Sequence, residues 1–449
     1  MNIRPDFTSG AGRNIAVIGA GISGLSAAWL LSRRHRVTLF EADGRLGGHS
    51  NTVEAGGVPV DTGFIVYNEK TYPNLTALFA YLGVATRMSD MSFSVSLDEG
   101  RTEYSGSGLR GLFAQPGNLV SPRFASMLKD LLRFYRRAPR DLPDMGLQSL
   151  DSYLDTHGYG AAFRDDHLYP MAAAIWSTPA AEVGRYPAAA FVRFCENHGL
   201  LQITARPAWR TVVGGSRSYV AQLRADLPGQ VFTDRRVRII RRFPGGVGVL
   251  TSDGEERAFD HVVIATHADQ ALAMLGRPTP AEADILGAFR YSRNEAVLHS
   301  DPRLMPRRAG AWAAWNYLAD RRGDPRLCVT YWMNRLQGLA GERPLFVTLN
   351  PTVEPMPETV AYRTTYEHPL FDAGAMAAQA RLWSLQGEGG VWYCGAYFGA
   401  GFHEDGLQAG LAVAEALGGV RRPWKVANES GRIALPAFQA LPATGEIAP

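Results

Sequence analysis

Two glycine-rich segments near opposite ends of the chain hold the residue types best suited to chemistry. The first is the motif Gly19-x-Gly21-x-x-Gly24, and the second runs from Gly395 to Gly406 and contains His403. Glycines at the first spacing let the backbone approach a pyrophosphate closely, and a helix that follows them offers free N–H groups and a positive dipole end to that anion. If the second segment contacts the far half of the same ligand, both ends of the chain meet on one dinucleotide. This arrangement points to a redox protein.

The first glycine motif stands where a strand would meet a helix. Residues 14–18 are apolar and β-branched and predict a buried parallel strand, and residues 25–31 have a helical composition. A second apolar strand, residues 36–40, ends in Glu41. This acid follows the glycines by about twenty residues, the sequence separation at which an acid accepts hydrogen bonds from an adenosine ribose. Strand, glycines, helix and acid in register favour a dinucleotide-binding unit over a chance glycine cluster. The motif alone fits NAD or FAD.

The segment that follows decides between these cofactors by resemblance. Residues 41–49 resemble the acid–arginine–glycine–glycine signature of the flavin amine oxidase superfamily, which includes monoamine and polyamine oxidases, protoporphyrinogen oxidase and carotenoid desaturases. The resemblance implies FAD, and it implies an α/β fold: a discontinuous Rossmann-type FAD-binding domain with an inserted α+β substrate domain, amine oxidase-like. His49 stands where many amine oxidases have a second arginine, which puts that arginine's phosphate contact in doubt.

Further segments look like parts of the same superfamily. Residues 232–240 look like the strand whose backbone holds the adenine, and residues 261–266 and 391–395 predict two more strands. A helix that begins near Asp405 would aim its positive end at the flavin. The cofactor-binding residues that the resemblance implies are Gly19, Gly21, Ile22, Ser23, Gly24, Glu41, Ala42, Arg45, Gly47, Gly48, His49, Thr62, Gly63, Phe64, Val237, Ala265, Thr266, Gly395, Ala396, Glu404, Asp405 and Gly406.

Four longer motifs resemble a narrower group. Residues 312–317, 329–337, 345–351 and 394–406 are similar to bacterial FAD-dependent oxidoreductases associated with cyclopropane and furan fatty acid biosynthesis. The resemblance implies desaturation of a methyl-branched, phospholipid-bound acyl chain by hydride transfer to flavin N5, and a lipid methyltransferase as partner. The alternatives are an amine or polyene oxidase of the same fold, a flavin-dependent double-bond isomerase, and an accessory subunit that positions lipid for a methyltransferase.

The candidate catalytic residues lie in the C-terminal glycine segment. His403 stands three residues before Gly406, where amine oxidases often place a cage tyrosine, and Tyr397 is a second candidate. His403 can act as a proton acceptor, can orient a substrate, or can simply bond backbone in a sharp loop. No lysine lies between Lys129 and Lys425, so the flavin-bridging lysine of many amine oxidases is missing and conventional amine oxidation is disfavoured.

The chain is long enough for two domains. We predict an FAD-binding domain from residues 14–85, 208–275 and 386–424, a substrate domain from 86–207 and 276–385, and tails at 1–13 and 425–449. The first insertion is helix-prone and the second is richer in strands, which predicts a mixed or antiparallel sheet. The tail after Trp424 is expected to be poorly ordered or to lie on the surface.

Composition narrows the partners. A net charge of +3 is too small to imply nucleic acid, and three widely spaced cysteines suit a reducing cytosol and give no metal-type spacing. We therefore predict no metal site and a cytoplasmic protein with no membrane span. Cys394 is a buried structural thiol or, alternatively, a covalent flavin link.

Two apolar features bear on a lipid substrate. Trp176, Trp312, Trp315 and Trp332 could line a slot for a hydrocarbon chain, although most aromatic residues belong to an ordinary core. Residues 127–140 alternate leucine and aromatic residues with arginine and lysine. Such a helix can lie on the inner face of an anionic membrane or can pack on the core with a solvated basic face.

Overall fold

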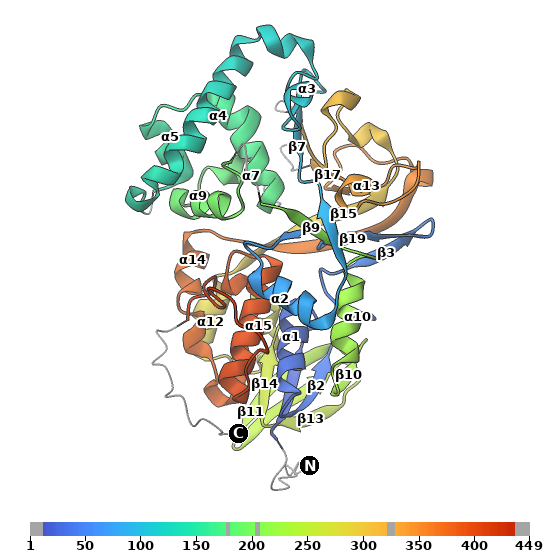
Figure 1. The fold of residues 1–449 in the computed structure, drawn as a ribbon. Coiled ribbons are helices and arrows are strands. Elements are labelled where there is room, and N and C mark those ends of the chain that lie inside the picture. The colour runs from blue at the N-terminus through green and yellow to red at the C-terminus, as the bar shows by residue number, and fades with distance from the viewer. Residues whose placement is uncertain (1–11, 147, 177–179, 203–206, 321–327, 436–449) are drawn as a thin grey trace, which may run out of the picture. The chain divides into compact units, whose positions relative to one another are not determined.

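The computed structural model describes residues 12–146, 148–176, 180–202, 207–320 and 328–435. They form two compact units (Figure 1): the first contains the chain up to Gly44, Pro228–Ala288 and the chain from Met376, and the second contains Arg45–Leu227 and Phe289–Ala375. The predicted domains divide the chain elsewhere, because residues 45–85 and 208–227 belong to the second unit, and 276–288 and 376–385 to the first. Which segments bind FAD and which bind substrate stays a prediction.

The first unit is built on a five-stranded parallel sheet. Its strands are short and apolar, and the central residues Ile15, Ala16 and Val17 are fully buried. The strand order reverses beside β1, and in such sheets ligands bind at the carboxyl ends of the strands near that point. The order across the sheet is β10 (Gln230–Phe232), β2 (Arg36–Phe40), β1 (Asn14–Ile18), β14 (His261–Ile264) and β20 (Val391–Tyr393).

Two helices follow the two glycine segments. Helix α1 (Ile22–Leu31) begins directly after Gly21 and is buried on all sides, as its apolar composition requires. Helix α15 (His403–Gly418) packs along it, so the predicted helix near Asp405 is confirmed, and it begins at His403. The unit also contains α11 (Ala268–Met274), α12 (Pro280–Gly287) and an antiparallel sheet of β11 (Val237–Phe243), β12 (Gly246–Thr251) and β13 (Glu256–Phe259).

The single strand predicted over residues 232–240 is wrong. The chain leaves the parallel sheet after Phe232 and enters the antiparallel sheet at Val237. Between them Asp234 has a positive φ of 56°, a turn conformation that the apolar pattern of the flanking residues does not reveal. Val237, the predicted adenine contact, therefore opens β11.

The second unit contains a seven-stranded mixed sheet, as predicted. All neighbouring strands are antiparallel except β16 and β7, which are parallel. The helix-prone first insertion contributes two of these strands, β7 and β8, which the sequence did not indicate. The order is β19 (Val360–Leu370), β15 (Arg290–His299), β18 (Phe346–Leu349), β17 (Cys328–Trp332), β16 (Trp315–Ala319), β7 (Phe93–Leu97) and β8 (Thr102–Ser105).

Helices and two small sheets complete the second unit. The longest helix, α4 (Pro122–Asp141), begins at Ser121, whose side chain accepts a hydrogen bond from the amide of Phe124. Among the residues that the structure describes, no helix combines the length and the apolar character needed to cross a bilayer. The remaining elements are β3 (Thr52–Ala55), β4 (Val58–Asp61), β5 (Tyr67–Asn68), β6 (Thr86–Ser89), β9 (Trp209–Val212), α2 (Pro73–Leu82), α3 (Leu109–Leu112), α5 (Leu150–Thr156), α6 (Ala161–Phe163), α7 (Tyr169–Trp176), α8 (Ala180–Val183), α9 (Ala188–Asn197), α10 (Arg217–Ala225) and α13 (Met333–Leu336), with α14 (Ala373–Gln379) at the boundary between the units.

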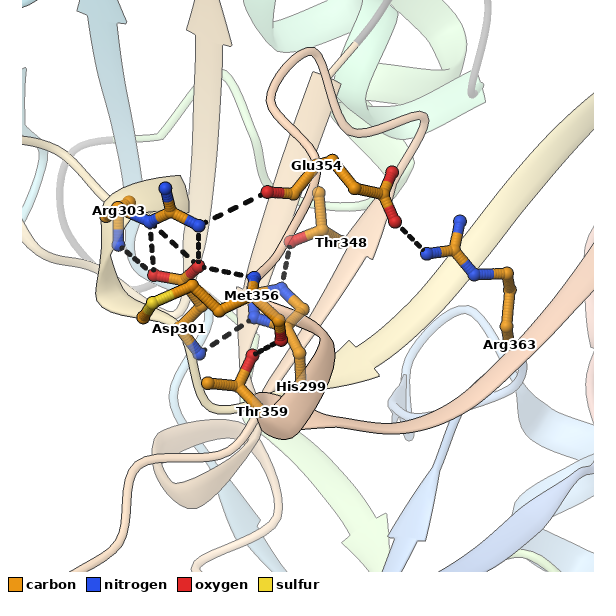
Figure 2. Close-up of polar contacts among 8 residues, drawn as sticks. All are labelled: His299, Asp301, Arg303, Thr348, Glu354, Met356, Thr359 and Arg363. Atoms are coloured by element: carbon orange, nitrogen blue, oxygen red, sulfur yellow. Dashed lines mark hydrogen bonds and ion pairs between the residues drawn. The ribbon is translucent and has the colours of Figure 1, made fainter.

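A buried polar cluster closes the end of β15 (Figure 2). His299 is fully buried; its Nδ1 accepts from the amide of Asp301 at 3.1 Å, so its Nε2–H donates to Thr348 Oγ1 at 2.7 Å. Asp301 is bound by the Arg303 side chain and by the amide of Met356 at 3.0 Å. Although burial alone would raise the pKa of Asp301, these partners lower it to about 2. The cluster ties the segment after β18 to the end of β15.

The neutral His299 makes stability depend on pH. Burial lowers its pKa from 6.5 to about 4, so between these values the unfolded chain binds a proton that the folded protein does not. Stability is therefore lost as pH falls through this window. We expect His299→Gln, which keeps a donor for Thr348, to lose less unfolding free energy than wild type between about pH 7 and about pH 4. Urea unfolding at several pH values measures this, and equal losses in the two proteins would contradict it.

Candidate cofactor site

Each of the three glycines of the first motif is required for a different structural reason. Gly19 has a φ of +96°, which favours glycine, and a Cβ there would lie 2.9 Å from the carbonyl oxygen of Ala265. A Cβ on Gly24 would lie 1.8 Å from the carbonyl oxygen of Gly19, so helix and loop touch there. A Cβ on Gly21 would meet nothing within 4 Å. A tight turn, a close helix contact and open space at the middle glycine are what a pyrophosphate cradle requires, so these residues fit a dinucleotide.

Glu41 is joined to this loop. Its Oε2 accepts from the amide of Ala20 at 2.6 Å, and its Oε1 accepts from the amide of Asp43 at 2.9 Å. The backbone of the same segment pairs with the turn after β10, because Arg235 N donates to Glu41 O at 2.8 Å and Asp234 N donates to Asp43 O at 3.1 Å. The predicted ribose acid and the predicted adenine segment therefore lie side by side. Ala42, between them, is exposed.

The loops after β1, β14 and β20 lie next to one another at the carboxyl end of the sheet. Gly19 faces Ala265, and a Cβ on Gly395 would lie 3.4 Å from the carbonyl oxygen of Thr266. Ala396 and Tyr397 follow in a 3-10 turn, and Tyr397 is buried. Gln379 fixes this loop by donating to the carbonyl oxygens of Tyr397 at 2.8 Å and Gly399 at 2.7 Å.

The C-terminal segment reaches the N-terminal one through the contact of α15 with α1. A Cβ on Gly406 would lie 2.7 Å from Ser23 Oγ, and a Cβ on Gly410 would lie 2.2 Å from the carbonyl oxygen of Ser23. The two helices therefore pack closely at Gly406, and their backbones touch at Gly410. Within the first unit, the structure brings together the predicted residues from both ends of the chain.

Three ionisable residues occupy the first turn of α15. Burial lowers the pKa of His403 to about 3, so its imidazole is neutral at physiological pH. Glu404 and Asp405 are fully buried, and Asp405 Oδ2 accepts from the amide of Phe402 at 2.7 Å. Asp405 therefore caps this helix. A pKa near 3 favours a neutral His403 that orients a group over one that stores a proton.

The predicted cofactor residues of the second unit form their own cluster. Gly47 and Gly48 have positive φ values of 110° and 56°, and Phe64 N donates to His49 O at 2.7 Å. A Cβ on Gly63 would lie 2.2 Å from that same carbonyl oxygen. This pairing brings residues 47–49 and 62–64 together. Arg45 contacts only the carbonyl oxygen of Ser50, at 3.5 Å, among the hydrogen bonds of the described residues.

Side chains from β19 cover the same cluster. The Tyr366 hydroxyl bonds Thr62 Oγ1 at 2.7 Å and accepts from Asn51 Nδ2 at 2.9 Å. The ring of His49 lies 5.1 Å from the ring of Tyr366 and 5.5 Å from that of His368. His49, which replaces the second arginine of the amine oxidase signature, is therefore held by aromatic contacts.

Asp61 anchors the strand that leads to Thr62. It is buried, and burial raises its pKa to about 6. Its carboxylate accepts from Thr52 Oγ1 at 2.6 Å, from the amide of Ser216 at 2.9 Å and from Gln337 Nε2 at 2.9 Å. One side chain thus joins β3, the start of α10 and the end of α13. Asp61 positions Thr62 and Gly63, a role that the sequence analysis did not assign.

The three predicted slot tryptophans whose side chains the structure describes do not gather in one place. Trp312 packs edge-to-face on Trp332 with ring centres 5.5 Å apart. Trp315 packs instead on Tyr331, with ring centres 4.8 Å apart, and is its cross-strand partner. Because consecutive residues of a strand point to opposite faces, Trp332 lies on the other face of the sheet from Tyr331 and Trp315. Trp176 ends α7, and its side chain lies outside the described residues. The prediction of one slot lined by Trp312, Trp315 and Trp332 is therefore wrong as a set.

Cys394 is buried, and burial raises the pKa of its thiol. A protonated thiol is a poor nucleophile, so the structure favours the structural role over a covalent flavin link. Gly410 and Arg432 also belong to this site but were not predicted from the sequence. Gly410 had a signal, because Gly406-x-x-x-Gly410 puts two glycines on one helix face. Arg432, which bonds Asp405, had none.

Comparison with known proteins identifies the group to which this geometry belongs. The family described as flavin containing amine oxidoreductase matches residues 22–298, more than half of the chain. A putative flavin-containing monoamine oxidase AofH of Mycobacterium tuberculosis is 28% identical over 279 residues. That alignment covers 60% of this chain and 60% of the relative, so the chain matches less than two thirds of that curated relative's length.

Two solved structures show the same fold at low identity. A double mutant of putrescine oxidase with redesigned cofactor binding has a TM-score of 0.67 at 16% identity, covering 91% of this chain and 99% of that one. A CLA-producing fatty acid isomerase from P. acnes has a TM-score of 0.63 at 16% identity, covering 90% of this chain and 98% of that one. The predicted α/β fold of the amine oxidase type is confirmed.

Proposed function

Because this chain belongs to the family of flavin-containing amine oxidoreductases and its cofactor is FAD, we propose that it desaturates a methyl-branched fatty acyl chain within a phospholipid. The observation that carries the proposal is the placement of the lipid-enzyme motifs. Residues 312–317, 329–337 and 345–351 fall on β16, on β17 with α13, and on β18, which are hydrogen-bonded neighbours. The three motifs therefore lie on neighbouring strands of one sheet.

One face of this part of the sheet carries aromatic side chains. Trp312 lies 5.5 Å from Trp332 and 6.0 Å from Phe346, and both tryptophans are partly exposed. Partly exposed aromatic rings suit a hydrocarbon chain. The chain has no lysine between Lys129 and Lys425, which disfavours an amine substrate.

The reaction removes a hydride and a proton, so the product carries one more double bond. Bound FAD supplies the two-electron acceptor for the hydride, and oxygen or a membrane quinone then takes the electrons. The proton leaves to water, and we assign to His403 the role of orienting the acyl chain, because its pKa near 3 keeps the imidazole neutral and makes it a weak base. Tyr397, buried in the adjoining loop, is the second candidate at this position.

Anaerobic mixing of the holoenzyme with a methyl-branched phospholipid tests the proposal. We expect loss of flavin absorbance and a lipid lighter by two hydrogen atoms in mass spectrometry. His403→Gln and Trp332→Leu should slow this step at unchanged FAD content, whereas Trp315→Leu, on the opposite face of the sheet, serves as the matched control. A flavin that stays oxidised with this lipid but bleaches with amines would overturn the proposal.

A second candidate is double-bond isomerisation, which the fold shared with a fatty acid isomerase favours. An isomerase moves a double bond without net electron flow, so the product mass equals the substrate mass and the flavin ends oxidised. The same experiment separates the two functions.

A membrane-bound substrate requires contact with a bilayer, and we place this contact at the segment between β8 and α4, which contains α3 (Figure 1). Leu109, Leu119 and Val120 there are 75%, 65% and 83% exposed. Arg110 is exposed beside them, and Lys129 and Arg136 are exposed on α4. Exposed apolar side chains with a cation next to them, as Arg110 is next to Leu109, fit an anionic lipid surface. The proposed contact therefore adds the exposed residues before α4 to the amphipathic segment 127–140 that the sequence indicated.

Vesicle binding tests this contact. We expect the double variant Leu109→Ser/Val120→Ser to bind anionic phosphatidylglycerol vesicles at least about tenfold more weakly than wild type, because burying each such side chain contributes about 1.5–3 kcal/mol. Val353→Ser, at a site 51% exposed, is the control and should bind like wild type. Equal co-sedimentation of all three proteins would contradict the assignment. If wild type bound neutral vesicles as well as anionic ones, the proposed contribution of the cations would be refuted.

A further inference from the structure

The C-terminal residues after α15 form a strap that returns along this helix. The strap comprises residues 420–433, part of which the sequence analysis assigned to a tail. Arg422 is buried, and its guanidinium binds Glu415 of α15 through two bonds, Nε to Oε1 at 2.8 Å and Nη2 to Oε2 at 2.9 Å. Trp424 stacks on Trp29 of α1 with ring centres 5.9 Å apart. The strap is therefore fastened to both helices that follow the glycine segments.

The far end of the strap reaches the first turn of α15. Arg432 Nε donates to Asp405 Oδ1 at 2.6 Å, and its Nη2 donates to Oδ2 at 3.3 Å. The Arg432 backbone amide donates to Gln408 Oε1 at 3.1 Å, and Gln408 Nε2 donates to Glu404 Oε1 at 3.0 Å. One residue of the strap thus holds both buried acids of the predicted flavin segment.

The ion pair has an electrostatic reason. Asp405 is fully buried, and a buried carboxylate without a counter-charge is strongly unfavourable. Burial raises the pKa of Asp405, and the guanidinium of Arg432 opposes this rise. An uncompensated acid would also cancel the positive end of the α15 dipole, which is the end that favours negative charge on a bound ligand. Arg432 offsets this effect of the Asp405 charge.

We infer that Arg432 is a positioning residue of the FAD site: its pairing with Asp405 and Gln408 fixes the first turn of α15 and balances the charge of Asp405 in this turn. Arg432 acts through these residues. The inference rests on the cofactor alone and is independent of the lipid substrate, so a failure of the proposed desaturation leaves it standing.

The test compares FAD affinity and flavin midpoint potential in purified variants. Arg432→Met leaves the buried carboxylate unpaired, so we expect it to bind FAD at least about tenfold more weakly. It should bind reduced FAD more weakly still, by about another tenfold, which lowers the two-electron potential by about 30 mV. Arg432→Lys, which keeps the charge, should restore most of both properties.

Two further variants separate this role from a merely structural one. Arg421→Met removes an arginine from the same strap, at a side chain 61% exposed, and should change neither quantity. Arg432→Met/Asp405→Asn restores the local charge balance, so its potential should return toward that of wild type; it also serves if the single variant does not fold. A lower melting temperature with an unchanged potential in the Arg432 variants, or an equal change in Arg421→Met, would overturn the inference.

Discussion

Replacing Gly24 by alanine is expected to abolish FAD binding. The new Cβ would lie 1.8 Å from the carbonyl oxygen of Gly19 and 3.0 Å from its carbonyl carbon, both backbone atoms of the phosphate loop. Neither atom can move aside as a side chain would, so the loop must leave its position against α1. Overpacking of this kind costs about 1–3 kcal/mol or more, and here all of it distorts the predicted cradle. FAD content of the purified protein, measured by absorbance, gives the result.

Gly21→Ala is the matched control in the same loop. Its Cβ would meet nothing within 4 Å, and its φ of −69° suits alanine, so the apoprotein should melt like wild type. The added methyl group occupies the open space where the pyrophosphate is predicted to lie, so FAD affinity alone should fall. Equal FAD affinity in Gly21→Ala and wild type would show that the dinucleotide lies elsewhere.

Gly410→Ala, almost four hundred residues away, is expected to damage the same site. Its Cβ would lie 2.2 Å from the carbonyl oxygen of Ser23 and 2.5 Å from Ser26 Oγ, so α15 would be forced away from α1. We expect a loss of roughly 3 kcal/mol of unfolding free energy, at the upper end of overpacking effects, together with weakened FAD binding. Chemical denaturation and FAD titration of the apoprotein measure the two effects.

Gly287→Ala controls for the substitution itself. Gly287 ends α12 in the same unit, and its Cβ would meet only Leu272 Cδ2, at an ordinary 3.6 Å. Since alanine is the better helix former, this variant should be as stable as wild type or slightly more stable. If Gly410→Ala behaved like Gly287→Ala, the close contact between the two helices would be refuted.

The parts of the site that the sequence predicted are those specified locally. Residues 14–41 contain a strand, a turn, a helix and an acid within one continuous segment, and every element forms where the pattern indicates. The glycines of this segment carry their own explanation, because a turn with positive φ and a close backbone approach exclude other residues. The helix near Gly406 was predictable because its pattern also lies within one continuous segment.

The parts that failed depend on partners far away in the sequence. Residues 232–240 read as one strand, yet they join two sheets, because strand pairing with β2 and with β12 decides where each strand ends. The register of β16 against β17 puts Trp315 and Trp332 on opposite faces, and no local pattern fixes that register. Arg432 lies in a segment whose composition suggests a tail, and only its long-range bond to Asp405 shows otherwise.

The most direct test of the account is amide hydrogen exchange of the apoprotein with and without FAD, read for both ends of the chain in one experiment. If one cofactor is held by both glycine segments, exchange should slow at residues 20–24 and at residues 403–406 together, with the same dependence on FAD concentration. Slowing confined to the N-terminal segment, with residues 403–406 unchanged at saturating FAD, would contradict it.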